Sequence, residues 1–101
     1  NVVNGGRIAN LPPDAIVEVP AVIDAHGVHA INVGELPQGI AALCKREILI
    51  QELAVEAAVK GDRWLALQAL LLDPVVDNAA AAERALDEIL RLQADYMPQF
   101  K

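Results

Sequence analysis

Hydrophobic positions recur with two different spacings along the chain. Up to residue 36 they form short, mostly β-branched runs, of which AIVEVPAVID and VHAINVG are the clearest. From residue 37 onward they recur near every 3.6 residues, the period of an α-helix. The sequence therefore predicts an α+β fold, with a β-hairpin region over 1–36 followed by a helical region over 37–101 that holds three α-helices.

The N-terminal region is predicted to form one β-hairpin. A corner at 11–14 (LPPD) excludes a helix before it, because residues that precede proline take extended angles. The run 15–24 reads as one strand, and Pro20 places it at a sheet edge or a bulge because proline cannot donate to a ladder. The segment 25–27 (AHG) then supplies a three-residue turn, and 28–34 supplies the second strand.

The first helix is predicted over 37–60. Pro37 suits the first turn of a helix, and Gly61 suits the position just past its end. One face of this helix carries its apolar side chains, and we expect that face to be buried: Ile40, Leu43, Cys44, Ile48, Leu53, Ala57 and Ala58.

Two shorter helices are predicted to follow. Asp62 would cap the second, RWLALQALLL, which is apolar nearly all round and should be buried on most sides before Asp73-Pro74 ends it. Asp77 or Asn78 would cap the third, and Pro98 would close it. The predicted apolar face of the third helix consists of Ala82, Leu86, Ile89 and Leu90. Two i,i+4 ion pairs are predicted on its polar side, Arg84–Glu88 and Asp87–Arg91.

Composition and charge exclude several classes of function. A chain of 101 residues is one domain at most. The net charge of −6 and the scattered basic residues exclude a nucleic-acid or anionic-membrane surface. A single cysteine excludes an internal disulfide and favours a reducing compartment, which indicates a cytoplasmic protein. The run WLALQALLL is too short to cross a bilayer.

The chain reads as part of a larger protein. A two-stranded hairpin is marginal alone, and the second helix is too apolar for a small free-standing bundle. The first residue is Asn rather than Met. We therefore expect another part of the polypeptide, or another subunit, to cover the missing surface.

Histidines and carboxylates in the hairpin region are the first chemical candidates. His26 and His29 lie on a turn and a strand, without cysteine or carboxylate ligands at metal spacing, so a structural role is favoured over ligation. Asp24 and Glu18 could form a carboxylate pair, but six residues of extended chain separate them by about 20 Å. That separation is too large for acid–base partners.

The remaining candidates also favour structural readings. Cys44 lies on an apolar helix face and reads as a small buried hydrophobe. Gly5-Gly6 is no phosphate loop, because no helix follows it. Trp64 and Tyr96 read as packing residues, and Lys45-Arg46 as a solvated patch. The residues alone identify no catalytic, cofactor-binding or metal-binding position.

The order and spacing of short motifs resemble the C-terminal segment of glycoside hydrolase family 4. That family includes α-glucosidases, α-galactosidases, α-galacturonidases and 6-phospho-glucosidases. The resemblance covers nearly the whole chain and is strongest over 4–76. One departure is Ala30, where the family's proline is expected, so the subfamily stays open. The motifs are Asn10-Leu11-Pro12, Val17-Glu18-Val19-Pro20, the strand from Gly27 to Gly34 with Leu36-Pro37, Glu52-Leu53, Glu56-Ala57-Ala58, Gly61-Asp62 and 69–74.

The resemblance implies an enzyme that works with NAD and Mn. The family oxidises the sugar at C3, uses the metal to polarise the ketone, eliminates the glycosidic oxygen after loss of the C2 proton, adds water and returns the hydride. The cofactor, metal and catalytic groups belong to upstream segments, so no catalytic, NAD-binding or metal-binding residue is carried over. The chain would then be the C-terminal part of a substrate domain like that of lactate/malate dehydrogenases.

By the same resemblance, its expected partners are the upstream NAD-binding domain, a sugar substrate and further copies in a homo-oligomer, without nucleic acid or membrane. Two alternatives stay open. The chain could be a stand-alone helical dimerisation module, or the C-terminal part of a 2-hydroxy-acid dehydrogenase. A catalytic histidine upstream, in place of a metal-binding cysteine and histidine, would favour the dehydrogenase.

Overall fold

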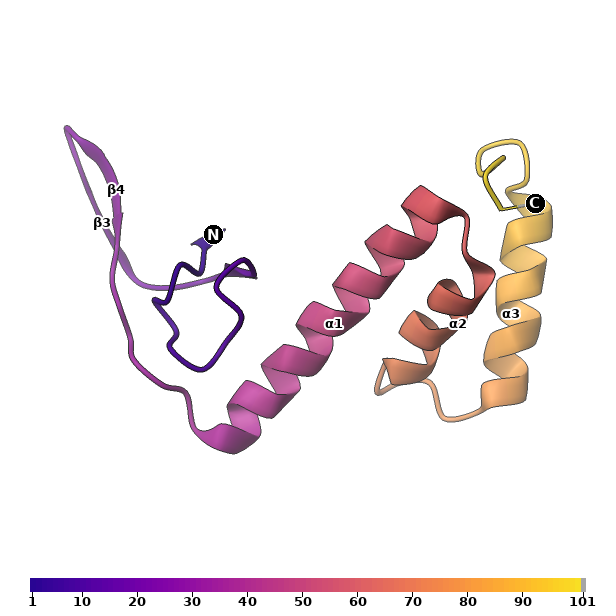
Figure 1. The fold of residues 1–101 in the computed structure, drawn as a ribbon, viewed down its shortest axis with the longest axis horizontal. Helices are drawn as coiled ribbons and strands as arrows, with labels where there is room; N and C mark the ends of the chain where they lie inside the picture. The colour runs from indigo at the N-terminus through magenta and orange to yellow at the C-terminus, as the bar shows by residue number, and fades with distance from the viewer. Residues whose placement is uncertain (101) are drawn as a thin grey trace. The chain divides into compact units, whose positions relative to one another are not determined.

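The computed structural model describes residues 1–100 and divides the chain into two compact units, Asn1–Lys45 and Arg46–Lys101. The elements appear in Figure 1, and each unit is described by itself. The fold is α+β, as predicted, with two small antiparallel sheets and three helices. In chain order the elements are β1 (Val2–Val3), β2 (Ile16–Val17), β3 (Ala21–Asp24), β4 (Gly27–Ala30), α1 (Gln38–Lys60), α2 (Arg63–Leu72) and α3 (Ala79–Leu92).

The predicted strand over 15–24 is divided at Pro20. β2 pairs with β1 at the N-terminus, while β3 pairs with β4. The prediction of one hairpin was therefore wrong, because the first few residues supply a partner for β2. Proline cannot continue a ladder through its own nitrogen, so the chain changes sheet at this position.

The second hairpin lies where the sequence predicts it, with a shorter turn. Asp24 pairs directly with Gly27, so only Ala25 and His26 form the loop. The backbone of Gly27 has φ +122°, a conformation that residues with a Cβ avoid. β4 is also shorter than the predicted 28–34 strand, although Ile31 still donates its N–H to the Pro20 carbonyl at 2.9 Å.

Asn4 organises the loop that joins β1 to β2. Its side chain is fully buried. The amide nitrogen donates to the carbonyls of Ile8, Leu11 and Pro12 at 3.0, 3.1 and 2.9 Å, and the amide oxygen accepts from Ile8 N at 2.7 Å. One polar side chain therefore satisfies several main-chain groups that a loop of this size would otherwise leave unpaired.

A second asparagine connects this loop to the chain that leads into α1. Asn10 donates its side-chain amide to the Leu36 carbonyl at 2.8 Å and accepts from Leu36 N at 3.0 Å. An isolated parallel bridge between Ile8 and Gly34 lies alongside. Buried apolar residues complete the core of this unit: Ile8, Leu11, Ala15, Val17 and Ala41.

The helices begin where the sequence predicts, and α1 and α2 also end there. α3 ends at Leu92, so the prediction that Pro98 closes it was wrong, because the residues after Gln93 form turns. α1 runs from Gln38 to Lys60, and Gly61 follows it with φ +67°. Asp62 caps α2 by accepting from Trp64 N and Leu65 N at 2.8 and 3.2 Å. Asn78, rather than Asp77, caps α3 by accepting from Ala81 N at 2.9 Å.

The helical unit has a small core where α2 meets α3. Leu67 on α2 and Ala82 and Leu86 on α3 are buried there, with Leu70 and Leu90 packed against them. Burial of the other predicted faces is only partial. Ile40 and Leu43 are about half exposed, and α2 leaves Trp64 66% exposed.

The predicted ion pairs on α3 form differently. Asp87 accepts from Arg63 Nη2 at 2.7 Å, not from Arg91, and Glu83 joins the same guanidinium at 3.3 Å. Arg91 pairs with Glu88 at 3.1 Å. Arg63 comes from α2, so tertiary packing offers Asp87 a partner that no spacing along α3 could indicate. The two carboxylates raise the pKa of Arg63, mainly because Arg63 donates a hydrogen bond to Asp87.

Candidate functional site

The two histidines of the hairpin gather around one carboxylate. Asp24 Oδ1 lies 3.0 Å from His29 Nε2 across the β3–β4 pair, and it accepts from His26 N at 2.7 Å in the turn. These bonds lower the pKa of Asp24, with the His26 main-chain bond as the largest cause. All three side chains are about half exposed or more. The group stabilises the turn, and Glu18 lies apart from it in the connection between β2 and β3.

No metal site forms among the residues that the structure describes. Within 1–100, no three His, Cys, Asp or Glu side chains cluster closely enough to hold an ion. Cys44, predicted to be a small buried hydrophobe, is half-buried on α1. Gly5-Gly6 leads into a loop rather than a helix. The residues present therefore do not fit a divalent metal or the pyrophosphate of a dinucleotide.

A polar hollow lies at the start of α1. It measures about 380 Å³ and is lined by residues from the loop, the lead-in segment and the first turns of the helix. Lys45 and Glu35 bring opposite charges to its wall. Its lining residues are Asn10, Glu35, Gln38, Ala41, Ala42 and Lys45.

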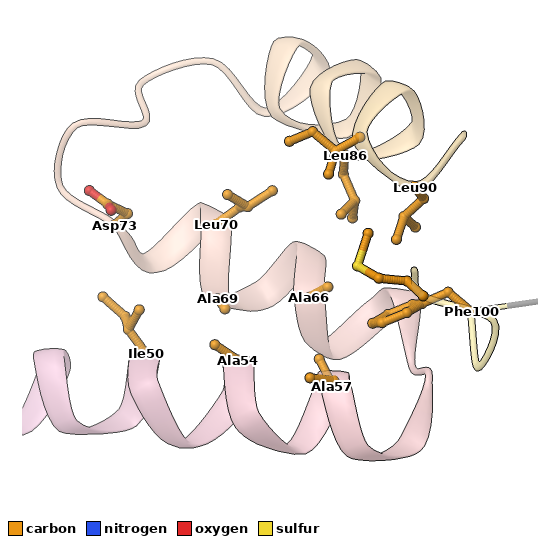
Figure 2. Close-up of a pocket in the computed structure, with 13 residues that line it drawn as sticks. Ile50, Ala54, Ala57, Ala66, Ala69, Leu70, Asp73, Leu86, Leu90 and Phe100 are labelled. Carbon is orange, nitrogen blue, oxygen red and sulfur yellow. The ribbon is translucent and has the colours of Figure 1, made fainter. Parts of the chain in front are cut away.

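The helical unit contains an apolar groove of about 330 Å³. Figure 2 shows Ile50, Ala54 and Ala57 of α1 on one wall, opposite Ala66 and Ala69 of α2. The third helix adds Leu86, Ile89 and Leu90, and the C-terminal segment adds Met97 and Phe100. Alanine side chains are short, so the space between the facing helices is wide enough to admit a side chain.

Asp73, at the end of α2, is the one charged residue in the groove lining. A sugar needs several convergent donors and acceptors, which this lining does not provide. The groove suits aliphatic or aromatic side chains. It is therefore a packing surface rather than a sugar-binding site.

The C-terminal segment closes one end of this groove. Gln99 Nε2 donates to the Ala58 carbonyl at 2.9 Å. The main chain of Gln99 passes so close to Gly61 that a Cβ there would lie 1.9 Å from the Gln99 carbonyl oxygen. Glycine thus serves twice, since it ends α1 with a positive φ and leaves room for the returning chain.

The predicted packing residues Trp64 and Tyr96 lie on the surface. Tyr96 is 84% exposed, and Trp64 has the Arg63 guanidinium 5.5 Å from its ring centroid. Sequence reasoning missed Asn4 and Asn10, whose side chains hydrogen-bond main-chain groups of the N-terminal unit. Their only sequence signal is that asparagine precedes glycine or a Leu-Pro pair, which marks a turn but not a buried side chain. In the described part of the chain, no helix is both long and apolar enough to cross a membrane.

Comparison with known sequences identifies the family. Residues 1–76 match the sequence profile described as the family 4 glycosyl hydrolase C-terminal domain. The matched span contains both small sheets, α1 and α2, together with the two asparagine-centred networks. The chain belongs to this glycosyl hydrolase family.

Individual relatives match along the whole chain. A probable 6-phospho-beta-glucosidase of Bacillus subtilis is 39% identical over 100 residues, which are 99% of this chain and 23% of the relative. An alpha-glucosidase of Erwinia rhapontici is 40% identical over 101 residues, 100% of this chain and 22% of the relative. The chain thus spans less than a quarter of the length of these relatives.

A solved structure shares the fold. The crystal structure of a 6-phospho-alpha-glucosidase from gut microorganisms, in complex with NAD and Mn²⁺, superposes with a TM-score of 0.87 at 29% identity. The match covers 99% of this chain and 23% of that protein. The predicted resemblance to this family is thereby confirmed.

Proposed function

We propose that residues 1–101 are the C-terminal segment of an NAD- and Mn-dependent glycosidase. The observation that carries the proposal is the family match over 1–76, together with relatives that are glycosidases along the whole of this chain. The 1–36 part would be the β-hairpin region of the segment, and 37–101 its helical region. The single cysteine is consistent with a cytoplasmic enzyme.

The reaction of the whole protein would be hydrolysis of a glycosidic bond through oxidation at the sugar C3. NAD would accept and return the hydride, and Mn would polarise the ketone that activates the C2 proton for elimination before water adds. Within residues 1–100 the side chains do not fit either group, so no step of that reaction is assigned to them. The catalytic, cofactor-binding and metal-binding residues would lie upstream.

This segment would contribute scaffold to the parent enzyme. Its helical unit offers an apolar groove with one charged residue, and its hairpin leaves Ile23 and Val28 exposed. Such surfaces are costly in water, and the rest of the polypeptide or another copy would cover them. The upstream NAD-binding domain and further copies in a homo-oligomer are the proposed partners.

The sugar is left open by the comparisons. A 6-phospho-beta-glucosidase and an alpha-glucosidase match this chain almost equally well, although they differ in anomer and in phosphate. We propose that this segment is a shared scaffold, and that the upstream part selects the sugar.

The test is to express the full-length protein that contains this chain and to measure hydrolysis of nitrophenyl α- and β-glucosides, with and without a 6-phosphate. Activity should require both NAD and Mn²⁺, and chelation of the metal should abolish it. A full-length protein that oxidises 2-hydroxy acids and cleaves none of the glycosides would contradict the proposal.

Substitutions within this segment test its scaffold role. In the full-length enzyme, Cys44→Ser and His29→Asn should leave kcat/KM within about threefold of the wild type, which is below about 1 kcal/mol in the barrier. A loss of about a hundredfold or more in kcat, with the melting temperature unchanged, would show that one of these residues takes part in catalysis.

A further inference from the structure

Asn4-Gly5 is the one asparagine–glycine pair in the chain. Asparagine is a thermolabile residue, because its side-chain amide can be lost to attack by the next main-chain nitrogen. Glycine leaves that nitrogen unhindered, since it has no Cβ and rotates freely. The residues that follow the other asparagines all carry a Cβ: Val2, Leu11, Val33 and Ala79. Among the asparagines of this chain, Asn4 is therefore the one whose local sequence most favours deamidation.

Deamidation requires Gly5 and the side chain of Asn4 to meet. The Gly5 nitrogen gives up its proton and bonds to the side-chain carbonyl carbon of Asn4, and the amide nitrogen leaves with that proton as ammonia. The cyclic succinimide that results takes up one water. Water breaks the bond from the Gly5 nitrogen to the side-chain carbon, which gives aspartate, or to the main-chain carbon, which gives isoaspartate. Water is the one co-reactant, and nothing is oxidised or reduced.

The folded chain engages both reacting groups elsewhere. Gly5 N donates to the Pro13 carbonyl at 2.8 Å. The two hydrogens of the Asn4 amide are shared among the three loop carbonyls, and its oxygen accepts from Ile8 N. The Asn4 side chain is 0% exposed, so the closed loop also excludes water from it. Attack therefore requires the loop to open, because these bonds must break before the nitrogen can be deprotonated and the amide can turn toward it.

Conversion would leave the loop without its central donor. An aspartate carboxylate has no hydrogens to donate, and in this buried site it would face three carbonyl oxygens, which is costly. Isoaspartate would route the main chain through the side-chain carbon. The main chain of Asn4 donates to Ala15 O at 2.7 Å and accepts from Arg7 N at 2.9 Å, and the longer link would displace these bonds. Neither product fits the closed loop.

We infer that Asn4-Gly5 is a deamidation site that the closed N-terminal unit blocks, and that its conversion makes opening of this unit irreversible. Opening of the unit should need less free energy than unfolding of the whole protein, because its strands are short and its loop depends on few side chains. Each opening allows the pair to react, so converted molecules accumulate even when the open form is rare.

The first test follows conversion of Asn4 in the full-length protein, in buffer and in urea at one pH and temperature. Peptide mass mapping measures aspartate and isoaspartate together, and methylation by an isoaspartyl methyltransferase measures isoaspartate alone. In urea, Asn4 should convert at least about tenfold faster than Asn32, which is followed by the β-branched Val33. In buffer, Asn4 should convert at least about a hundredfold more slowly than in urea.

Hydrogen exchange measures the same opening by an independent route. The ratio of the buffer rate to the urea rate for conversion of Asn4 should match, within about threefold, the same ratio for exchange of the Gly5 amide. Equal conversion rates in buffer and urea would show that the fold does not protect Asn4. A ratio outside that range, or no conversion in urea, would also overturn the inference. These readouts are chemical, so they are independent of the proposed glycosidase activity.

Ile8→Ala should loosen the loop without changing the reacting pair. Ile8 is 6% exposed, and loss of its buried side chain should raise the native conversion rate about tenfold or more, with the rate in urea unchanged. Glu18→Gln, at an exposed position after β2, is the matched control and should stay within about threefold of the wild type. An unchanged rate in Ile8→Ala, or equal acceleration in both variants, would contradict blocking by the closed loop. If Ile8→Ala fails to fold, the wild-type comparison in buffer and urea still decides.

Asn4→Asp supplies the aspartate product directly. The Ile8 amide, which donates to the Asn4 side chain in the wild type, should exchange at least about a hundredfold faster in this variant at neutral pH. Wild-type protein that has been deamidated in urea and returned to buffer should show the same loss of protection. Wild-type protection of Ile8 in either sample would show that the unit closes again after conversion, and would overturn the irreversible step.

Discussion

The two units of this chain are held together by different forces. In 1–45, regular structure is scarce, and two asparagine side chains bind main-chain groups: Asn4 within its own loop, and Asn10 at Leu36, 26 positions away. In 46–100, the helices satisfy their own main chains and are joined by aliphatic packing around Leu67 and Leu86. The contrast shows how a chain without long strands can still order an irregular region, since a buried amide can act where a ladder would otherwise be needed.

The two units should also respond differently to substitutions. Main-chain groups in the N-terminal unit depend on single side chains, so one substitution leaves several of them unpaired in the interior. Apolar packing in the helical unit is distributed over many contacts, and part of it borders an open groove, where neighbours can move to fill a space.

Asn4→Ala should have the largest effect. It removes the acceptor of Ile8 N and the donor to three carbonyls, and we expect the full-length protein to lose about 4 kcal/mol of unfolding free energy. Urea unfolding measures the loss, and hydrogen exchange at Ile8 locates it. Asn10→Ala is the matched control, with an expected cost of about 2 kcal/mol because it breaks two partly buried bonds. Equal costs for the two variants would refute the central role of Asn4.

Leu86→Ala should have the second largest effect. We expect a loss of about 3 kcal/mol of unfolding free energy, because the substitution deletes a buried side chain between α3 and α2. The groove beside it lets the site relax, so the cost should stay below that of Asn4→Ala. Urea unfolding of the same full-length protein gives the comparison. Ile89→Ala on the same helix is the control, since Ile89 is 49% exposed and should cost about 1 kcal/mol. A larger loss for Leu86→Ala than for Asn4→Ala would reverse the contrast drawn between the units.

Gly61→Ala should lower the stability of the full-length protein, whereas Gly39→Ala should raise it. At Gly61 the new methyl would meet the Gln99 carbonyl and the backbone has a positive φ, so we expect a loss of about 2 kcal/mol and release of the C-terminal segment from the groove. The loss is limited because the segment can move away. Gly39 lies within α1 with open space around it, and alanine there should add about 0.5 kcal/mol. Thermal unfolding shows whether each variant is less or more stable than the wild type. Proteolytic cleavage after Arg91 reports the release of the C-terminal segment.

A stabilised Gly61→Ala variant would show that the C-terminal segment does not lie against Gly61 in solution. A destabilised Gly39→Ala variant would indicate that another part of the full-length protein approaches the start of α1.

The smallest effect concerns pH. The pKa of the Asp24 carboxyl is lowered from its ordinary value of 3.8 by the bonds from His26 N and His29. Because the folded pKa is the lower one, the stabilisation is present above the unfolded value and is lost as the pH falls through the folded value. A carboxyl NMR titration should therefore place the midpoint of Asp24 below its ordinary value of 3.8. His29→Asn should move the midpoint of Asp24 upward, and a wild-type midpoint at or above 3.8 would contradict the geometry.

Local signals made the helical unit largely predictable. The residues that start, cap and end the helices lie within a few positions of the groups they act on, as Pro37, Gly61, Asp62 and Asn78 all do. The same is true of the β3–β4 turn, where the strands are adjacent in sequence. The order of short motifs was enough to indicate the family, because motif spacing is retained along the chain.

Tertiary structure alone decided the features that join distant residues. The pairing of β1 with β2, which divides the predicted strand at Pro20, depends on residues more than ten positions apart, and so does the capture of Asp87 by Arg63. The burial of Asn4 likewise could not be predicted. The sequence does not distinguish a polar residue in an exposed turn from one that is buried and hydrogen-bonded. Periodicity and capping record the environment of neighbouring residues, whereas burial and pairing depend on which distant groups the folded chain brings together.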